Sequence, residues 1–275
     1  AAVKAHKHVY CEKPAAPDAY GAVRMIKAAE GVKDLSLVMG FQVRHASAYD
    51  EMIRRVHNGD IGKIVAAQLY YNSGGGSGKK PAVEDDEFRI RHHFQYLALS
   101  GGVLNDQAIH VIDVCRAALN ANPLYAFGQS SAEGRRFEYG DTHTNYQVIY
   151  KYPNDVNVAV QQMSVGTTSG GVCARFFGEL GTAEANYSGG VFITGPNKWD
   201  SGIDNALGDA DTNKGRSFIG SIISGNYINE IEAGCNSTLM AILGREAAAK
   251  GKTLTWNKLV KSNQRYGNQP DLSKF

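Results

Sequence analysis

The sequence lacks the features of a membrane protein, a zinc protein and a nucleic-acid-binding protein. Its apolar runs are much shorter than the roughly 18 residues that a membrane-spanning helix requires. Its four cysteines are scattered and form no CxxC pair, which argues against a zinc site and against a dense disulfide framework. No dense Lys/Arg run is present, and 29 basic residues nearly balance 27 acidic ones. We therefore expect no membrane span and no nucleic-acid partner.

The sequence also lacks a metal motif and a readable targeting segment. The adjacent His92 and His93 are among eight histidines, but no spacing matches HExxH or a facial triad, so we expect no metal. The chain starts at Ala1 without an initiator Met and without the basic and apolar regions of a signal peptide. Localisation therefore stays open, with the cytoplasm as the default expectation and export as the alternative.

What is present is enough for a large globular core, because 43% of the 275 residues are hydrophobic. The first region predicts a short strand at 8–11, a helix at 18–29 and a buried strand at 35–41. This strand, helix and strand form the tail of a parallel α/β unit. A further helix is predicted to follow, capped by Ser47 with Asp50.

The second region changes character after a strand at 64–71. We predict helices at 87–99 and 104–119, and a long loop at 197–216. Several short strands after Pro123 predict an antiparallel sheet. The expected fold class is α+β: the tail of a parallel α/β domain followed by a domain with an antiparallel sheet. The predicted boundaries are 1–45 and 46–275, with a closing helix at 232–250 that packs back toward the first region.

The first candidate functional residue is Lys13, in the turn Glu12-Lys13-Pro14 directly after a predicted buried strand. Pro14 restricts Lys13 to an extended conformation and so holds its side chain at the carboxyl end of the strand. Ligands of open α/β sheets bind at that end. The alternative is an ordinary surface charge.

The second candidate is the pair Asp106 and His110, four residues apart on a helix predicted to begin after two glycines. This spacing places both side chains on one helix face, where the carboxylate would orient and charge-stabilise the imidazole. A histidine with a pKa near neutral could accept a proton from a hydroxyl. The alternative is helix capping and surface charge. We interpret the nearby Asp113 as structural.

The third candidate is the segment 40–45, which contains Gln42 and Arg44 at the end of the next predicted strand. Polar groups at this carboxyl edge could face a ligand. The alternative is a plain connecting loop. Together the three clusters could surround one crevice.

Five segments, in this order, resemble the Gfo/Idh/MocA oxidoreductase family over essentially the whole chain. They are KHVYCEKPAA, GFQVRH, SGGVLNDQAIHVIDV, ELGTAEANY and LMAILGREAAAKGKTLTW. The resemblance implies a Rossmann domain joined to a second domain, with NAD or NADP between them. The second domain is expected to have a large, open-faced, mostly antiparallel sheet with helices on one face. It implies that Lys13 positions substrate and nicotinamide, together with Glu12, Gln42 and Arg44 on the cofactor side.

The resemblance also implies that His110 is the general acid/base, assisted by Asp106. The residues Gln107, Arg91, His92 and His93 become candidates for binding substrate hydroxyls; the alternative is a solvated helix face. The sequence departs from the family in one respect, because it contains no G-x-G-x-x-G. We therefore expect that most of the Rossmann domain is missing from the sequence, and the choice between NAD and NADP cannot be read.

The function that follows is oxidation of a hydroxyl on a sugar, cyclitol or related polyol by an NAD(P)-dependent enzyme; the fragment alone is expected to be inactive. One alternative is a glycosidase of the same family that works by oxidation and elimination. Another is a non-enzymatic sugar-binding or oligomerisation module. Each version includes a homo-oligomer through the open sheet face, since an uncovered face would be an exposed apolar patch.

Overall fold

A computed structural model of the chain describes residues 1–166, 170–267 and 269–274. Its main element is a nine-stranded sheet in the order β12-β11-β10-β9-β3-β8-β7-β5-β13. Among the described strands of this sheet only β3 and β8 pair in parallel. The strands are β3 Ile64–Ser73, β5 Tyr125–Ser131, β7 Asn145–Lys151, β8 Asn157–Ser164, β9 Gly171–Gly178, β10 Thr182–Asn186, β11 Val191–Thr194, β12 Trp199–Asp200 and β13 Leu254–Thr255. The predicted α+β class with a mostly antiparallel sheet is confirmed.

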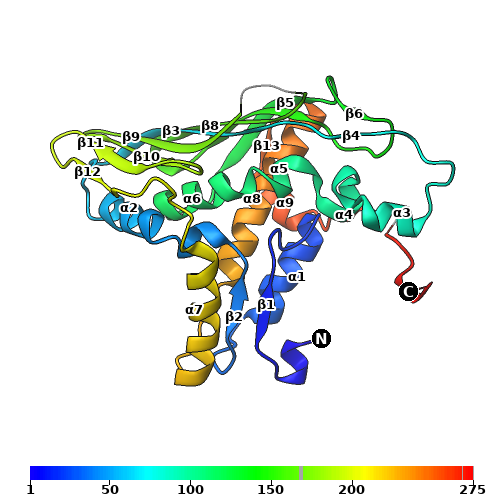
Figure 1. The fold of residues 1–275 in the computed structure, drawn as a ribbon, viewed down its shortest axis with the longest axis horizontal. Coiled ribbons are helices and arrows are strands. Elements are labelled where there is room, and N and C mark those ends of the chain that lie inside the picture. Colours follow the sequence, from blue (N-terminus) through cyan, green and yellow to red (C-terminus); the bar gives the residue numbers. More distant parts are fainter. Residues whose placement is uncertain (167–169, 268, 275) are drawn as a thin grey trace.

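The sheet has one covered face and one open face. Strand β7 shows why: Tyr146, Val148 and Tyr150 alternate inward and are buried, whereas Gln147 between them is exposed. Helices α2 (Ser47–His57), α6 (Ile109–Leu119) and α8 (Ile231–Lys250) lie on the covered side (Figure 1). The smaller elements are β4 Ser77–Gly78, β6 Arg136–Phe137 and α9 Trp256–Lys261.

The first region is a two-stranded parallel unit. Strands β1 (Val9–Cys11) and β2 (Leu37–Met39) pair in parallel, connected by α1 (Ala19–Ala29). The Asp18 carboxylate caps α1 by accepting from the Gly21 backbone N–H at 2.8 Å. The predicted strand, helix and strand are therefore confirmed. The unit projects from the helix side of the sheet layer (Figure 1), and α1 packs against α8, the helix predicted at 232–250.

The helix predicted at 104–119 is wrong, because the structure divides it into α5 (Gly102–Asp106) and α6. In a continuous helix the Asp106 carbonyl would accept from the His110 N–H. Instead the His110 N–H donates to the Gln107 carbonyl at 3.3 Å, and the Asp106 carbonyl accepts from Lys13 Nζ at 2.6 Å. A contact 93 residues away in sequence thus replaces the local one.

Three other predictions are wrong in part. The helix predicted at 87–99 is divided into α3 (Asp86–Arg91), a 3-10 turn (His93–Gln95) and α4 (Leu97–Ser100), because Tyr96 is extended. The long loop predicted at 197–216 contains β12 and the start of α7 (Ala210–Ser224). Ser47 does not cap its own helix, since its hydroxyl donates to Asp209.

No helix in the described part of the chain has the length and hydropathy that a membrane span requires. Within the same residues, no three His, Cys, Asp or Glu side chains lie close enough together to hold a metal ion.

Candidate active site

Lys13 and Asp106 lie side by side between the parallel unit and the helices under the sheet. Lys13 follows β1, and its Nζ atom is 2.6 Å from the Asp106 carbonyl oxygen and 3.6 Å from the Asp106 carboxylate. The two side chains are 19% and 16% exposed, so the pair is reachable from solvent. Burial raises the pKa of Asp106, and the charges of Lys13 and His93 oppose that shift.

His110 lies in α6, enclosed by two tyrosines. Its ring centroid is 5.5 Å from that of Tyr187, which follows β10, and 6.4 Å from that of Tyr71 in β3. The residue is 6% exposed, and its Nδ1 atom has no hydrogen-bond partner among the described residues. Burial, followed by the positive charge of Lys13, lowers the pKa of His110 to about 3. The imidazole is therefore neutral at neutral pH. Its pKa is well below the near-neutral value expected from the sequence.

The expected contact between Asp106 and His110 is not found. No hydrogen bond or ion pair joins the two side chains in the described part of the chain, because the helix break after Asp106 removes them from a common face. The carboxylate that raises the His110 pKa, against the effect of burial, is Asp113. Asp106 therefore contacts Lys13, and His110 is left with a free nitrogen.

Lys214 is a site residue that the sequence analysis missed, because its helix, α7, begins within the stretch expected to be a loop. Its Nζ atom is 2.9 Å from Asp211 and 3.5 Å from Glu12, and lies 5.7 Å from the centroid of the Tyr10 ring. Its charge also lowers the pKa of His110. Tyr71 and Tyr187 were missed as well, since a tyrosine within a strand or directly after one has no spacing that marks it as part of a site.

The remaining cofactor-side candidates differ in exposure and in whether their side chains are already bound within the protein. Arg44 forms two hydrogen bonds to the Asp113 carboxylate, at 2.7 and 2.5 Å, and so is bound within the protein. Glu12 is 61% exposed and pairs with Lys214. Gln42 begins the 3-10 turn Gln42–His45 after β2 and is partly buried. Of these, Glu12 and Gln42 lie at the carboxyl ends of β1 and β2.

The substrate-side candidates separate into two groups. The Gln107 side chain accepts from the Ser73 hydroxyl at 3.3 Å, and the His93 charge acts on Asp106, so both belong to the surroundings of the site. Arg91 instead pairs with Glu87 at 2.8 Å on the surface. His92 stacks on Phe88, with ring centroids 4.1 Å apart. The structure does not bring Arg91 and His92 to Lys13.

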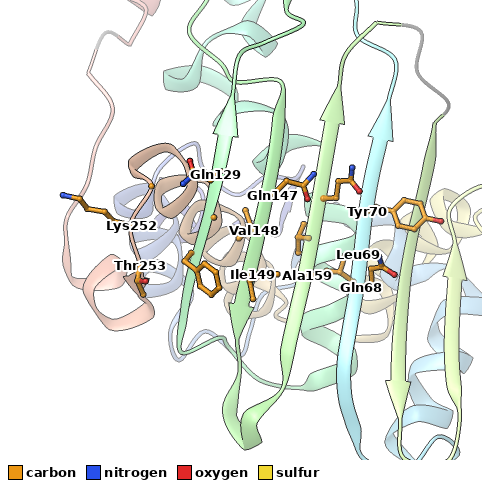
Figure 2. A pocket seen from close by; sticks show the side chains of 15 residues that line it. Gln68, Leu69, Tyr70, Gln129, Gln147, Val148, Ile149, Ala159, Lys252 and Thr253 are labelled. Carbon is orange, nitrogen blue, oxygen red and sulfur yellow. The ribbon is translucent and has the colours of Figure 1, made fainter.

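A separate hollow of about 450 Å³ lies on the open face of the sheet (Figure 2). It is lined by Tyr70, Phe127, Gln129, Gln147 and Ile149, among others. Lys13, Asp106 and His110 do not line it. It is therefore a feature of the open sheet face and distinct from the candidate active site.

The candidate site offers a hydrogen-bond donor and two kinds of acceptor to a polar ligand. Lys13 supplies an ammonium donor, Asp106 a carboxylate and His110 a neutral acceptor whose Nδ1 atom is buried and unpartnered. No G-x-G-x-x-G stands in the chain to bind a dinucleotide phosphate. The residues thus fit the reacting end of a nicotinamide dinucleotide and a hydroxylated substrate.

Comparison with known proteins agrees with this fold. Residues 49–184 match the family model of the GFO/IDH/MocA C-terminal domain. A 1,5-anhydro-D-fructose reductase of Ensifer adhaerens is 30% identical over 136 residues, which cover 49% of this chain and 37% of that protein. A myo-inositol 2-dehydrogenase of Thermotoga maritima is 27% identical over 151 residues, 54% of this chain and 40% of that protein. The matched part thus spans less than half the length of these relatives.

Solved structures show the same architecture. A myo-inositol 2-dehydrogenase from Lactobacillus plantarum has a TM-score of 0.70 at 21% identity, covering 92% of this chain and 75% of that one. A levoglucosan dehydrogenase in complex with NADH and L-sorbose has a TM-score of 0.73 at 18% identity, covering 92% and 74%. Residues 49–184 thus match the C-terminal domain of the Gfo/Idh/MocA family, and the chain shares its fold with these solved structures.

Proposed function

We propose that this chain is the substrate-binding and catalytic part of an NAD(P)-dependent enzyme that oxidises a hydroxyl of a sugar, cyclitol or related polyol. The observation that carries the proposal is the pairing of the Lys13 ammonium with the Asp106 carboxylate, near enough to the buried His110 for the Lys13 charge to lower its pKa. The names of the relatives, which act on a cyclitol and an anhydro sugar, support the substrate class.

In the proposed reaction His110 accepts the proton of the reacting hydroxyl, since its ring is unprotonated at neutral pH and its Nδ1 atom has no hydrogen-bond partner among the described residues. Burial opposes this step, and the Asp113 carboxylate, which raises the His110 pKa, favours it. Lys13 donates a hydrogen bond to the same substrate oxygen, and Asp106 keeps the ammonium in place. Tyr71 and Tyr187 exclude water from the imidazole. Bound NAD or NADP supplies the hydride acceptor.

We further propose that residues 1–45 are part of a dinucleotide-binding domain and residues 46–275 the substrate domain. On this proposal Glu12, Lys13 and Gln42 face the cofactor, since they lie at the carboxyl ends of parallel strands. Arg44 acts there through its pair with Asp113. Gln107 and His93 are the proposed substrate contacts.

The test is the turnover of the His110→Ala variant in the full-length protein that carries this chain. We expect turnover to fall by a factor on the order of 10²–10⁴ when a general base is lost.

His143→Ala is the control, because His143 bonds to Ser130 near the end of β5 and does not contact His110. Substrate-dependent accumulation of reduced nicotinamide is measured with NAD and with NADP. Near-normal turnover of His110→Ala would remove His110 from the mechanism, and cleavage of a glycoside without that accumulation would favour the eliminating glycosidase.

We also propose that two copies of the chain meet through the open sheet face. Phe127 is 45% exposed there, and its cross-strand neighbour Ile149 lines the same hollow. Sedimentation velocity tests this: Ile149→Lys should shift an oligomer toward monomers. A monomeric unaltered protein would contradict the proposal.

A further inference from the structure

The loop that follows Lys13 is anchored at three consecutive backbone positions by side chains from the helices. Each anchoring side chain is almost wholly buried, at 0 or 1% exposure. The bonds run from Ala15 N–H to Thr238 Oγ1 (3.1 Å), from Asn105 Nδ2 to the Ala16 carbonyl (3.0 Å) and from Arg245 Nη1 to the Pro17 carbonyl (2.8 Å). Such loops usually bond to water, so three buried side-chain partners in a row fix this backbone closely.

Two of the anchors also hold the turn that leads to Asp106. The same Nη1 atom of Arg245 donates to the Gly101 carbonyl at 2.7 Å, and Asn105 Nδ2 lies 3.4 Å from the Ser100 carbonyl. Gly101 immediately precedes α5, whose last residue is Asp106. One guanidinium therefore ties the segment carrying Lys13 to the segment carrying its partner.

The charge of Arg245 is costly to bury, and the structure compensates for it locally. Its Nε and Nη2 atoms lie 3.4 and 3.1 Å from the Glu246 carboxylate, and its guanidinium carbon is 5.0 Å from the centroid of the Tyr266 ring. A buried ion pair is weak evidence for stability alone, because apolar residues of similar volume often do as well. A role in fixing the backbone next to Lys13 explains why a charged side chain is buried at position 245.

We propose that Arg245 is a positioning residue that holds Lys13 against Asp106, assisted by Asn105 and Thr238. The lysine side chain has a flexible four-carbon stem, so its ammonium can be placed only if the backbone at its base is fixed. A displacement of about 1 Å at a reacting group can cost roughly 10²-fold in rate. The catalytic consequence rests on the proposed function, whereas the positioning itself does not.

The test is the reactivity of the Lys13 amine in the full-length Arg245→Met variant. Acetic anhydride labels lysines, and mass spectrometry reads the rate at each site. We expect Lys13 labelling to rise at least threefold, while Lys151, which is also 19% exposed and pairs with Asp155, keeps its rate. If the enzyme oxidises polyols, its kcat should fall about tenfold or more, with a smaller change in KM.

The matched control is Tyr150→Phe. Its hydroxyl donates to the Met240 carbonyl of the same helix at 2.9 Å and is equally buried, but it does not touch the lysine loop. This variant should lose stability without faster Lys13 labelling. If Arg245→Met does not fold, Thr238→Val should still raise Lys13 labelling, because it removes the acceptor for the Ala15 N–H together with one bond inside α8, to the Gly234 carbonyl.

The outcomes separate the two proposals. Unchanged Lys13 labelling in the folded Arg245→Met variant, or in Thr238→Val where the former does not fold, would overturn the positioning role, whatever the activity. An unaltered protein that does not reduce NAD or NADP with any polyol would overturn the proposed function. Faster labelling of Lys13 would support the positioning role even then.

Discussion

Two ion pairs link the parallel unit to the helices under the sheet, and they differ in hydrogen bonding and in burial. Arg44 and Asp113 form two short hydrogen bonds, and Ser237 adds a third to the same carboxylate at 2.6 Å. Asp113 is 1% exposed. Lys13 and the Asp106 carboxylate are 3.6 Å apart, with both side chains partly exposed. The Asp113 carboxylate is thus held by three hydrogen bonds, whereas the longer pair leaves the Lys13 ammonium and the Asp106 carboxylate more available to a ligand.

The difference indicates which polar groups hold the structure and which can bind a ligand. A buried carboxylate that already accepts three hydrogen bonds is costly to separate from its partners, whereas a partly exposed pair at 3.6 Å can exchange partners at little cost. His110 lies under the influence of both, because Asp113 raises its pKa and Lys13 lowers it. The predictions below test this distinction.

Replacing Asp113 should have the largest effect on stability. Asp113→Ala leaves the Arg44 guanidinium without its partner, and breaking such a pair costs about 3–5 kcal/mol. Asp106→Ala, the matched change in the longer pair, should cost about 1 kcal/mol or less, as is usual for pairs open to solvent. Urea denaturation of both variants measures the difference. Equal losses would contradict the comparison.

Acid should destabilise the protein through His110. In the folded chain its pKa lies at about 3, and in the unfolded chain near 6.5, so the unfolded chain binds more protons between these values. Stability therefore falls as the pH falls, by roughly 2 kcal/mol between pH 7 and pH 5 from this group. The unfolding free energy of His110→Gln, measured at both pH values, should lack this contribution. An equal loss in the variant would show that His110 is not buried in its neutral form.

The glycine turn before α5 should show a smaller effect. Gly101 has φ of +75°, and an added Cβ would lie 2.3 Å from Asn105 Nδ2. Gly202 has φ of +66° but nothing within 4 Å of that position. Gly202→Ala should therefore cost about 1 kcal/mol from backbone strain alone. Gly101→Ala should cost about 1 kcal/mol more, because Asn105 must move. Thermal unfolding compares the two variants. Equal costs would show that Asn105 can move away from the added methyl group without loss of stability.

Those parts of the fold that follow from local patterns could be predicted from the sequence. The parallel unit was predicted because 8–11, 18–29 and 35–41 have distinct patterns, and the antiparallel sheet because several short β-rich runs follow Pro123. The break between α5 and α6 could not be predicted, since the Asp106 carbonyl that a continuous helix would use is bonded there by Lys13, 93 residues away in the sequence.

The same limit applies to the candidate site. Lys13 and Asp106 were both selected from the sequence, and the structure brings them together. The assumed contact between Asp106 and His110 was wrong, because it depended on an unbroken helix. Lys214 was missed, since α7 carries few apolar residues in a periodic pattern and was expected to be a loop.

The closest partner of the Lys13 ammonium is a main-chain oxygen, the carbonyl at position 106. Every amino acid offers this oxygen, so its contribution is independent of the residue encoded there. A scan of side chains at this position would therefore understate how much the site depends on it. Replacing the amide with an ester by chemical synthesis, which weakens the carbonyl as an acceptor, would measure what no genetic substitution can.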